Sequence, residues 1–332
     1  MSQYILNPDL FNDNVKLEPI RAGFGRGLKA AGEANDKVVA LSADLTDSTK
    51  VGLFRDAFPN RFIQVGIAEQ NLVTVASGLA AAGKIPFASS YAAFNPGRNW
   101  EQIKTTIALN DQPVKIIASH AGVGVGPDGA THQMLEDIAM MRVMSNMIII
   151  APGDSLEAEK ATKAIAENQK PSYLRLAREN TPIISSDDAP FEIGQAYVLR
   201  QGSDISLMGT GTMTYQLLAA ANILASRGID AEVVHVPTIK PLDNDTIIAS
   251  AHKTGRVLTA EEAQIAGGFG GAVAELLSEK LPTPLLRVGI QDRYGESGEP
   301  SELLEYFGLT GEHIANKTED FVHNTSQYHR KY

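Results

Sequence analysis

The chain of 332 residues contains no cysteine. This absence excludes disulfides, thiolate nucleophiles and cysteine-ligated metal sites together. Basic residues are outnumbered, since 29 Lys and Arg stand against 39 Asp and Glu and give a formal net charge of −10. Nucleic-acid-binding proteins carry a basic patch, and no basic run occurs here, so nucleic acid is not an expected partner. Individual basic residues can still bind small anionic substrates.

Long hydrophobic runs are also missing. No apolar stretch reaches the roughly 18 residues that a membrane span needs. Residues 1–14 lack the basic and apolar regions of a signal peptide. We therefore expect no membrane partner and a cytoplasmic location. A hydrophobic fraction of 43% and a charged fraction of 20% are typical of a globular protein, and the length allows two domains of ordinary size.

Motifs for a nucleophile or a nucleotide are missing as well. The sequence has no GxSxG elbow and no GxxxxGK[ST] phosphate loop. The run GTGTM at residues 209–213 lacks the third glycine of a dinucleotide fingerprint. Acid and base groups without a nucleophile indicate an organic cofactor that supplies the difficult chemistry.

Apolar runs alternate with helical patterns along the first half of the chain. Strands are predicted over residues 38–42, 61–65, 85–89, 114–119, 147–152 and 172–177, and helices over residues 18–34, 69–83, 97–109, 134–143 and 154–167. Near-continuously apolar strands alternating with helices predict a doubly wound α/β domain with a parallel sheet.

The same alternation restarts after a segment rich in turn formers. Strands are predicted over residues 205–211, 231–237, 256–262 and 285–290, with helices between them and further helices over residues 300–323. We therefore predict two doubly wound domains. The expected division is an N-terminal arm (1–14), a first domain (15–182), a linker (183–194), a second domain (195–325) and a tail (326–332).

Polar and aromatic residues follow the strands of the first domain. In parallel sheets, ligands bind beyond the carboxyl ends of the strands. The residues at these positions are Asp44, Ser48, Glu69, Tyr91, Phe94, His120 and Arg178. Two of them have a structural alternative: Glu69 could be a charge that complements the dipole of a helix N-terminus, and Asp44 could form an Asx turn.

Residues 119–133 form a glycine-rich segment with two histidines and an aspartate. We expect a long flexible loop, in which glycines let the backbone approach a ligand closely. His120, His132 and a carboxylate suit proton transfer or recognition of a polyhydroxylated substrate. A metal site is disfavoured because the two histidines lack a compact spacing and a third ligand.

Four motifs together resemble the C-terminal half of the transketolases, which are thiamine-diphosphate enzymes. They are GIAEQN at 66–71, SYAAFNPGR at 90–98, HAGVGVGPDGATHQ at 120–133 and YLRLAREN at 173–180. The resemblance runs from about residue 15 to 325. It implies a pyrimidine-binding domain followed by a transketolase C-terminal domain. The GDG…N motif that family members use for magnesium and diphosphate is not found here.

The resemblance also implies roles for the cofactor-binding residues. Glu69 would hydrogen-bond N1′ of the aminopyrimidine and favour the imino tautomer that takes the proton from the thiazolium carbon. Tyr91 and Phe94 would line the pyrimidine pocket. Asp44 and Leu45 would approach the cofactor across the subunit contact.

Further roles implied by the resemblance concern the sugar. Asp128 would bind a substrate hydroxyl, and His132 the carbonyl or its neighbouring hydroxyl, with His132 and His120 taking part in catalysis beside Glu69. The phosphate end of the substrate would be surrounded by Arg21, Ser48, His120 and Arg178. Arg98 has two interpretations: it contacts phosphate, or it braces the helix over 97–109.

The implied protein is the C-terminal subunit of a split transketolase in the pentose phosphate pathway. It would transfer a two-carbon ketol unit between sugar phosphates as a two-plus-two heterotetramer with an N-terminal-half subunit. Mg²⁺ (or Ca²⁺) would be held mainly by that partner, so no metal ligand is assigned here. Alternatives are a β subunit of a 2-oxoacid dehydrogenase, an enzyme resembling deoxyxylulose-phosphate synthase and, least favoured, a non-catalytic scaffold.

Overall fold

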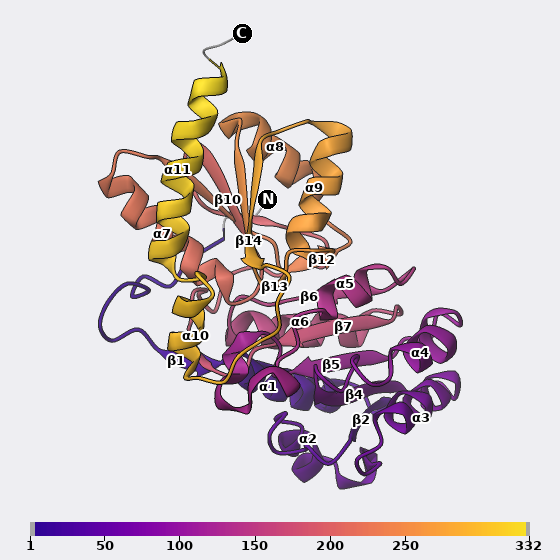
Figure 1. The fold of residues 1–332 in the computed structure, drawn as a ribbon. Coiled ribbons are helices and arrows are strands. Elements are labelled where there is room, and N and C mark those ends of the chain that lie inside the picture. Colours follow the sequence, from indigo (N-terminus) through magenta and orange to yellow (C-terminus); the bar gives the residue numbers. More distant parts are fainter. Residues whose placement is uncertain (1–3, 330–332) are drawn as a thin grey trace.

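The computed structural model describes residues 4–329 and contains two α/β domains (Figure 1). In the first domain a seven-stranded sheet has the order β12-β6-β7-β5-β4-β2-β3, and its strands are parallel except β12. The six strands from this domain are β2 (Val38–Ser42), β3 (Phe62–Gln64), β4 (Ile85–Tyr91), β5 (Lys115–Ser119), β6 (Ile148–Ile150) and β7 (Ser172–Leu176).

Helices cover both faces of this sheet. One face packs against α1 (Ile20–Ala34), α2 (Gly52–Ala57) and α6 (Ser155–Glu167). The other packs against α3 (Glu69–Ala81), α4 (Trp100–Gln102), the π-helical turn Ile103–Ala108 and α5 (Asp137–Arg142). Strands enclosed on both faces are buried along their whole length, as β2, β5 and β7 are. This enclosure explains why these strands are mostly apolar.

The second domain is a five-stranded sheet in the order β14-β13-β10-β11-β9, with β9 antiparallel to its neighbour. Helices α8 and α9 cover one face, and α7 and α11 cover the other. The elements are β9 (Tyr197–Arg200), β10 (Ile205–Gly209), α7 (Met213–Ser226), β11 (Ala231–His235), α8 (Asn244–Thr254), β13 (Val257–Gln264), α9 (Phe269–Lys280), β14 (Leu285–Ile290), α10 (Pro300–Tyr306) and α11 (Gly311–His329).

The two domains share a strand and a core. Strand β12 (Thr238–Lys240) leaves the second domain and pairs antiparallel with β6 at the edge of the first sheet. One apolar cluster continues from α3 and α5 to α8 and α9, so the domain boundary is packed rather than open. None of the helices within residues 4–329 is long and apolar enough to cross a membrane.

The segments expected to lack regular structure are partly ordered. Strands β1 (Leu17–Pro19) and β8 (Asn180–Pro182) form a small antiparallel ribbon where the sequence predicts a helix start and a domain end. The arm lies along the linker, with Leu6 bridging Ser185. Helix α11 continues to His329, past the expected start of the tail. Residues 1–3 of the arm and 330–332 of the tail lie outside the described residues.

The glycine-rich segment differs from the flexible loop expected from the sequence. Residues Val123–Thr131 form turns of 3₁₀ helix that are interrupted at Gly126 and Gly129, where φ is +81° and +70°. His120 itself has a positive φ of 61°. The segment is an ordered connection, because its backbone is held by contacts that reach into the second domain.

Candidate active site

The aromatic side chains predicted at the strand ends come together at the carboxyl edge of the first sheet. Tyr91 is the last residue of β4, and its ring stacks on His120, just after β5, with centroids 3.7 Å apart. Phe94 lies beside Tyr91 at 6.1 Å. His132 turns its ring edge toward Phe94 at 5.5 Å. Four rings from two of the predicted motifs, 90–98 and 120–133, therefore form one aromatic wall.

Arg21 joins this wall from the start of α1. Its Nη1 donates to the Ser48 carbonyl at 2.7 Å and lies 3.1 Å from His120 Nε2. The Ser48 hydroxyl is 2.6 Å from the Tyr91 hydroxyl. The sequence pattern alone did not place Arg21 here, because it precedes the first long strand. Its contacts now link the predicted phosphate-binding residues to the aromatic wall.

The surroundings of His120 oppose its protonation. The side chain is 2% exposed, and burial is the largest influence that holds its pKa well below the usual range. The positive charges of Arg21 and Arg178, with a smaller effect from His132, act in the same direction. Nδ1 lies 2.8 Å from the Ser119 hydroxyl. His120 is therefore a neutral imidazole, which can donate or accept one hydrogen bond but carries no charge.

Glu69 begins α3 and is buried, with 1% of the residue exposed. Its Oε2 forms an ion pair with Arg98 Nη1 at 2.6 Å, whereas Oε1 has a long contact of 3.5 Å to the Ser90 hydroxyl. Arg98 also lies over the Phe94 ring, 4.6 Å from its centroid. A ligand that contacts the Glu69 carboxylate would therefore approach it from the side of the aromatic wall. Neither interpretation of Arg98 from the sequence included this ion pair.

The polar residues around Glu69 were not identified from the sequence. Asn99 donates to the Glu69 carbonyl at 2.9 Å and to Asn95 Oδ1 at 3.0 Å. Asn95 in turn donates to the carbonyl of Ala88 in β4. These amides lie within the FNPGRN run, and their spacing of four residues is the signal that could have revealed them. They fix the start of α3 against the strand that carries Tyr91.

The remaining predicted residues lie at the margin of this cluster. Arg178 follows β7; its guanidinium donates to the Val125 carbonyl and lies 3.6 Å from Glu179. Asp128 is exposed on the 3₁₀ segment. Asp44 is also exposed, and its N–H donates to Gln64 Oε1 rather than to the cluster. Leu45 is half-buried, and its carbonyl accepts from Thr49. The single chain does not bring Asp44, Leu45 and Asp128 into the aromatic wall.

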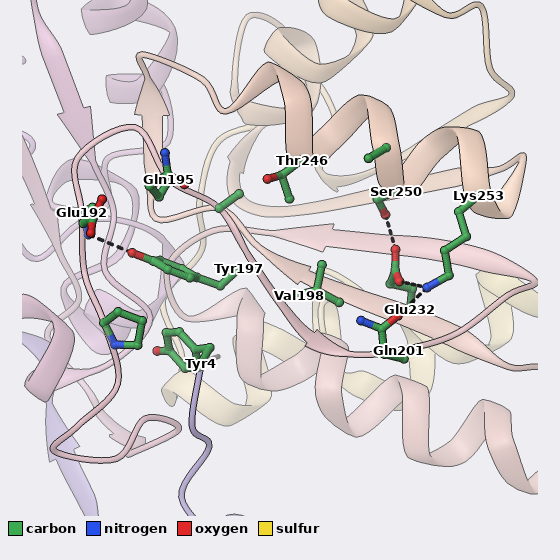
Figure 2. A pocket seen from close by; sticks show the side chains of 13 residues that line it. Tyr4, Glu192, Gln195, Tyr197, Val198, Gln201, Glu232, Thr246, Ser250 and Lys253 are labelled. Carbon is green, nitrogen blue, oxygen red and sulfur yellow. Dashed lines mark hydrogen bonds and ion pairs between the residues drawn. The ribbon is translucent and has the colours of Figure 1, made fainter. Parts of the chain in front are cut away.

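No group of three or more His, Asp or Glu side chains among residues 4–329 could hold a metal ion. A cavity of about 490 Å³ lies apart from the cluster, in the second domain (Figure 2). Its buried Glu232 accepts from Ser250 Oγ and pairs with Lys253, which also donates to Gln201. The carboxylate of Glu232 is therefore already paired, unlike Oε1 of Glu69 at the edge of the first sheet.

Comparisons with known proteins match both domains. The family model for the transketolase pyrimidine binding domain matches residues 19–183, and that for the transketolase C-terminal domain matches residues 194–314. A putative transketolase C-terminal section from Methanocaldococcus jannaschii is 45% identical over 90% of this chain and 94% of its own length.

Two further proteins of similar extent match this chain. A 6-deoxy-6-sulfo-D-fructose transketolase subunit from Clostridium sp. (strain MSTE9) is 42% identical over 85% of this chain and 88% of its own. A solved structure described as a split gene transketolase, inactive beta4 tetramer, has a TM-score of 0.86 at 43% identity and covers 92% of this chain and 98% of its own. The chain therefore belongs to the transketolase family of thiamine-diphosphate enzymes and carries its pyrimidine-binding and C-terminal domains.

Proposed function

We propose that this chain is the C-terminal-half subunit of a transketolase divided between two chains. Together with an N-terminal-half subunit it transfers a two-carbon ketol unit from a ketose phosphate to an aldose phosphate. The observation that carries the proposal is the buried Glu69 carboxylate beside the wall formed by Tyr91 and Phe94. Relatives of about the same length, which include a transketolase C-terminal section, support the division into two chains.

The residues present fit the pyrimidine end of thiamine diphosphate. Oε1 of Glu69 has the single weak contact to Ser90, so a buried carboxylate oxygen has room for one more hydrogen-bond partner. Aromatic rings beside it provide the apolar contact that a flat heterocycle needs. Bound there, the cofactor supplies a stabilised carbanion centre at its thiazolium ring. Glu69 would hold the proton that is exchanged with N1′.

The other side chains fit a sugar phosphate. The positive charges of Arg21 and Arg178 both lower the pKa of His120, so two guanidinium groups lie near the same imidazole. A guanidinium matches phosphate geometry because its planar fork donates two parallel hydrogen bonds. The neutral imidazole of His120 would lie with Ser48 at the phosphate end of the substrate, and His132 would hydrogen-bond the carbonyl or its neighbouring hydroxyl. Asp128 would bind a further hydroxyl, and Asp44 and Leu45 would meet the cofactor at a subunit contact.

In this function, two chains each hold one end of the cofactor. Within residues 4–329 no acidic or histidine cluster could hold a metal ion. The proposed partner would therefore hold the diphosphate through Mg²⁺ or Ca²⁺, which are cations that prefer oxygen ligands.

The Glu69→Gln variant tests this function. Because an amide cannot exchange a proton with N1′, we expect turnover in the assembled enzyme to fall by on the order of 10² to 10⁴, the usual contribution of a general acid or base. The far-UV circular dichroism of the chain should not change. Glu101→Gln is the matched control, since Glu101 is exposed in the adjacent α4. Turnover of Glu69→Gln close to that of wild type would remove Glu69 from the mechanism and with it the basis of the proposal.

A further inference from the structure

The glycines of the 119–133 segment face atoms of the second domain. A methyl group added at Gly122 would overlap Glu262 Oε1, and one added at Gly129 would overlap Ser297 Oγ. At Gly126 it would lie 3.3 Å from the Pro300 ring. All three glycines have positive φ. Their small size therefore lets the second domain approach this backbone closely, a packing role that the sequence did not indicate.

Glu262 fastens one end of the segment. It lies in β13, is 4% exposed, and accepts the Gly124 N–H on Oε1 at 2.7 Å. Its Oε2 accepts from the Thr212 hydroxyl at 2.7 Å. The Glu262 carbonyl accepts from Arg175 of β7 at 2.9 Å. Glu262 thus makes two bonds across the domain boundary, from the Gly124 N–H and from Arg175, while the Thr212 hydroxyl orients its carboxylate from within the second domain.

Gln133 fastens the other end. Its amide is buried, and Nε2 donates to the Val123 carbonyl at 3.1 Å and to the Glu296 carbonyl at 2.8 Å. Glu296 lies in residues 295–297, part of the chain between β14 and α10 that runs down onto the first domain (Figure 1). We call these residues the strap. Gly295 of the strap packs directly on Gln133, because a methyl group there would overlap Oε1.

We propose that Glu262, Gln133 and the strap are positioning elements. They hold the 123–132 backbone so that Asp128 and His132 are correctly placed to bind the substrate. This inference rests on the proposed function, which assigns those two residues to the sugar. Asp128 is exposed, so the 3₁₀ backbone beneath it sets its position. A misplacement of about 1 Å in a positioned group can lower a rate about 10²-fold. The second domain would thus take part in substrate recognition without touching the substrate.

Two glycine-to-alanine variants test the proposal, one in the strap and one just beyond it. Gly295→Ala places a methyl group against Gln133 Oε1. Gly298→Ala is the matched control, because its methyl group meets the flexible Leu303 side chain at 3.3 Å, away from Gln133. Neither glycine has a positive φ, so both changes are allowed by the backbone and have similar effects on the unfolded chain.

The first measurement uses the full chain alone. In Gly295→Ala we expect the amides of residues 123–132 to exchange hydrogen on the order of tenfold faster than in wild type, while β2 and β5 keep their protection. Gly298→Ala should match wild type. Unchanged exchange in this segment in a folded Gly295→Ala protein would overturn the proposal. This measurement does not depend on catalysis, so it remains decisive if the proposed ketol transfer itself fails.

The second measurement uses the chain assembled with an N-terminal-half subunit. Gly295→Ala should raise KM for the ketose phosphate by roughly 10- to 100-fold, with a smaller change in KM for thiamine diphosphate, since Glu69 and Phe94 lie outside the segment. A merely structural defect would reduce the amount of active enzyme and leave both KM values unchanged. That outcome, or equal effects of Gly295→Ala and Gly298→Ala, would contradict the positioning role.

Discussion

His120 determines how the site responds to acid. Its folded-state pKa is held far below the ordinary value of about 6.5 by burial and by Arg21 and Arg178, whereas the unfolded chain takes up the proton normally. The unfolded state therefore binds more protons below pH 6.5, and stability falls as pH falls through that value. Between pH 7.5 and 5.5 this group should remove about 1.4 kcal/mol from the free energy of unfolding.

The prediction is tested by urea unfolding at both pH values. His120→Asn should reduce the loss of stability on acidification by that amount. His252→Asn, at an exposed position on α8, should leave the loss as it is in wild type. If acidification destabilises His120→Asn as much as wild type, His120 is not held neutral by its surroundings.

Arg178 carries the prediction about the substrate's phosphate. Arg178→Ala should lower kcat/KM for phosphorylated sugars roughly 10- to 100-fold, because a hydrogen bond to a charged group contributes about 1.5–3 kcal/mol. Sugars without a phosphate should be much less affected. Arg227→Ala, at the end of α7 and paired with Glu319, is the control. Equal losses for both kinds of sugar would argue against a phosphate contact.

Asp154 shows how a single side chain joins two elements. It caps α6 by accepting the Glu157 N–H at 2.8 Å, and its Oδ2 accepts from the backbone N–H groups of Ile184 and Ser185. Asp154→Ala leaves these buried donors without partners, so we expect a loss of roughly 2–4 kcal/mol in thermal or urea unfolding. Asp187→Ala is the control, because Asp187 is exposed in the linker that carries Ile184 and Ser185; it should change stability by less than about 0.5 kcal/mol. A similar result for both variants would disprove the capping role.

Elements enclosed on both faces could be predicted from the sequence. Strands β2, β5 and β7 are mostly apolar and fully buried, and their predicted bounds differ from the observed ones by at most one residue. Strands β1, β8, β9 and β12 were missed; each has only three or four residues, and β1 and β8 contain proline. Strands β3 and β6 are as short, but they lie within the hydrophobic runs 61–65 and 147–152 and were predicted. The pairing of the missed strands depends on chain segments far away in the sequence, which local periodicity does not report.

The same limit applies to the site. The rule that ligands bind at the carboxyl ends of parallel strands correctly places Tyr91 beside His120, and both near Ser48. The Arg98–Glu69 ion pair depends on the turn before α4, whose geometry the sequence does not specify. The packing of the second domain on the glycines of 119–133 is likewise a tertiary contact. The catalytic and binding roles of all these residues remain predictions.

At the scale of the whole molecule, the two domains behave as one packed body. Strand β12 completes the first sheet from the second domain, and the apolar cluster is continuous between them. In the proposed function, the aromatic wall and Glu69 would contact one end of thiamine diphosphate. We expect a cofactor held at one end to bind weakly, so a second chain would have to hold the diphosphate.

Assembly is therefore the most direct test of the central claim. Light scattering and a coupled ketol-transfer assay should be applied to this chain alone, to an N-terminal-half transketolase subunit alone, and to their mixture. We expect a two-plus-two complex that binds thiamine diphosphate and transfers ketol units, with no measurable transfer by either subunit alone. Robust ketol transfer by this chain in isolation, or a mixture that forms no complex and stays inactive, would contradict the claim.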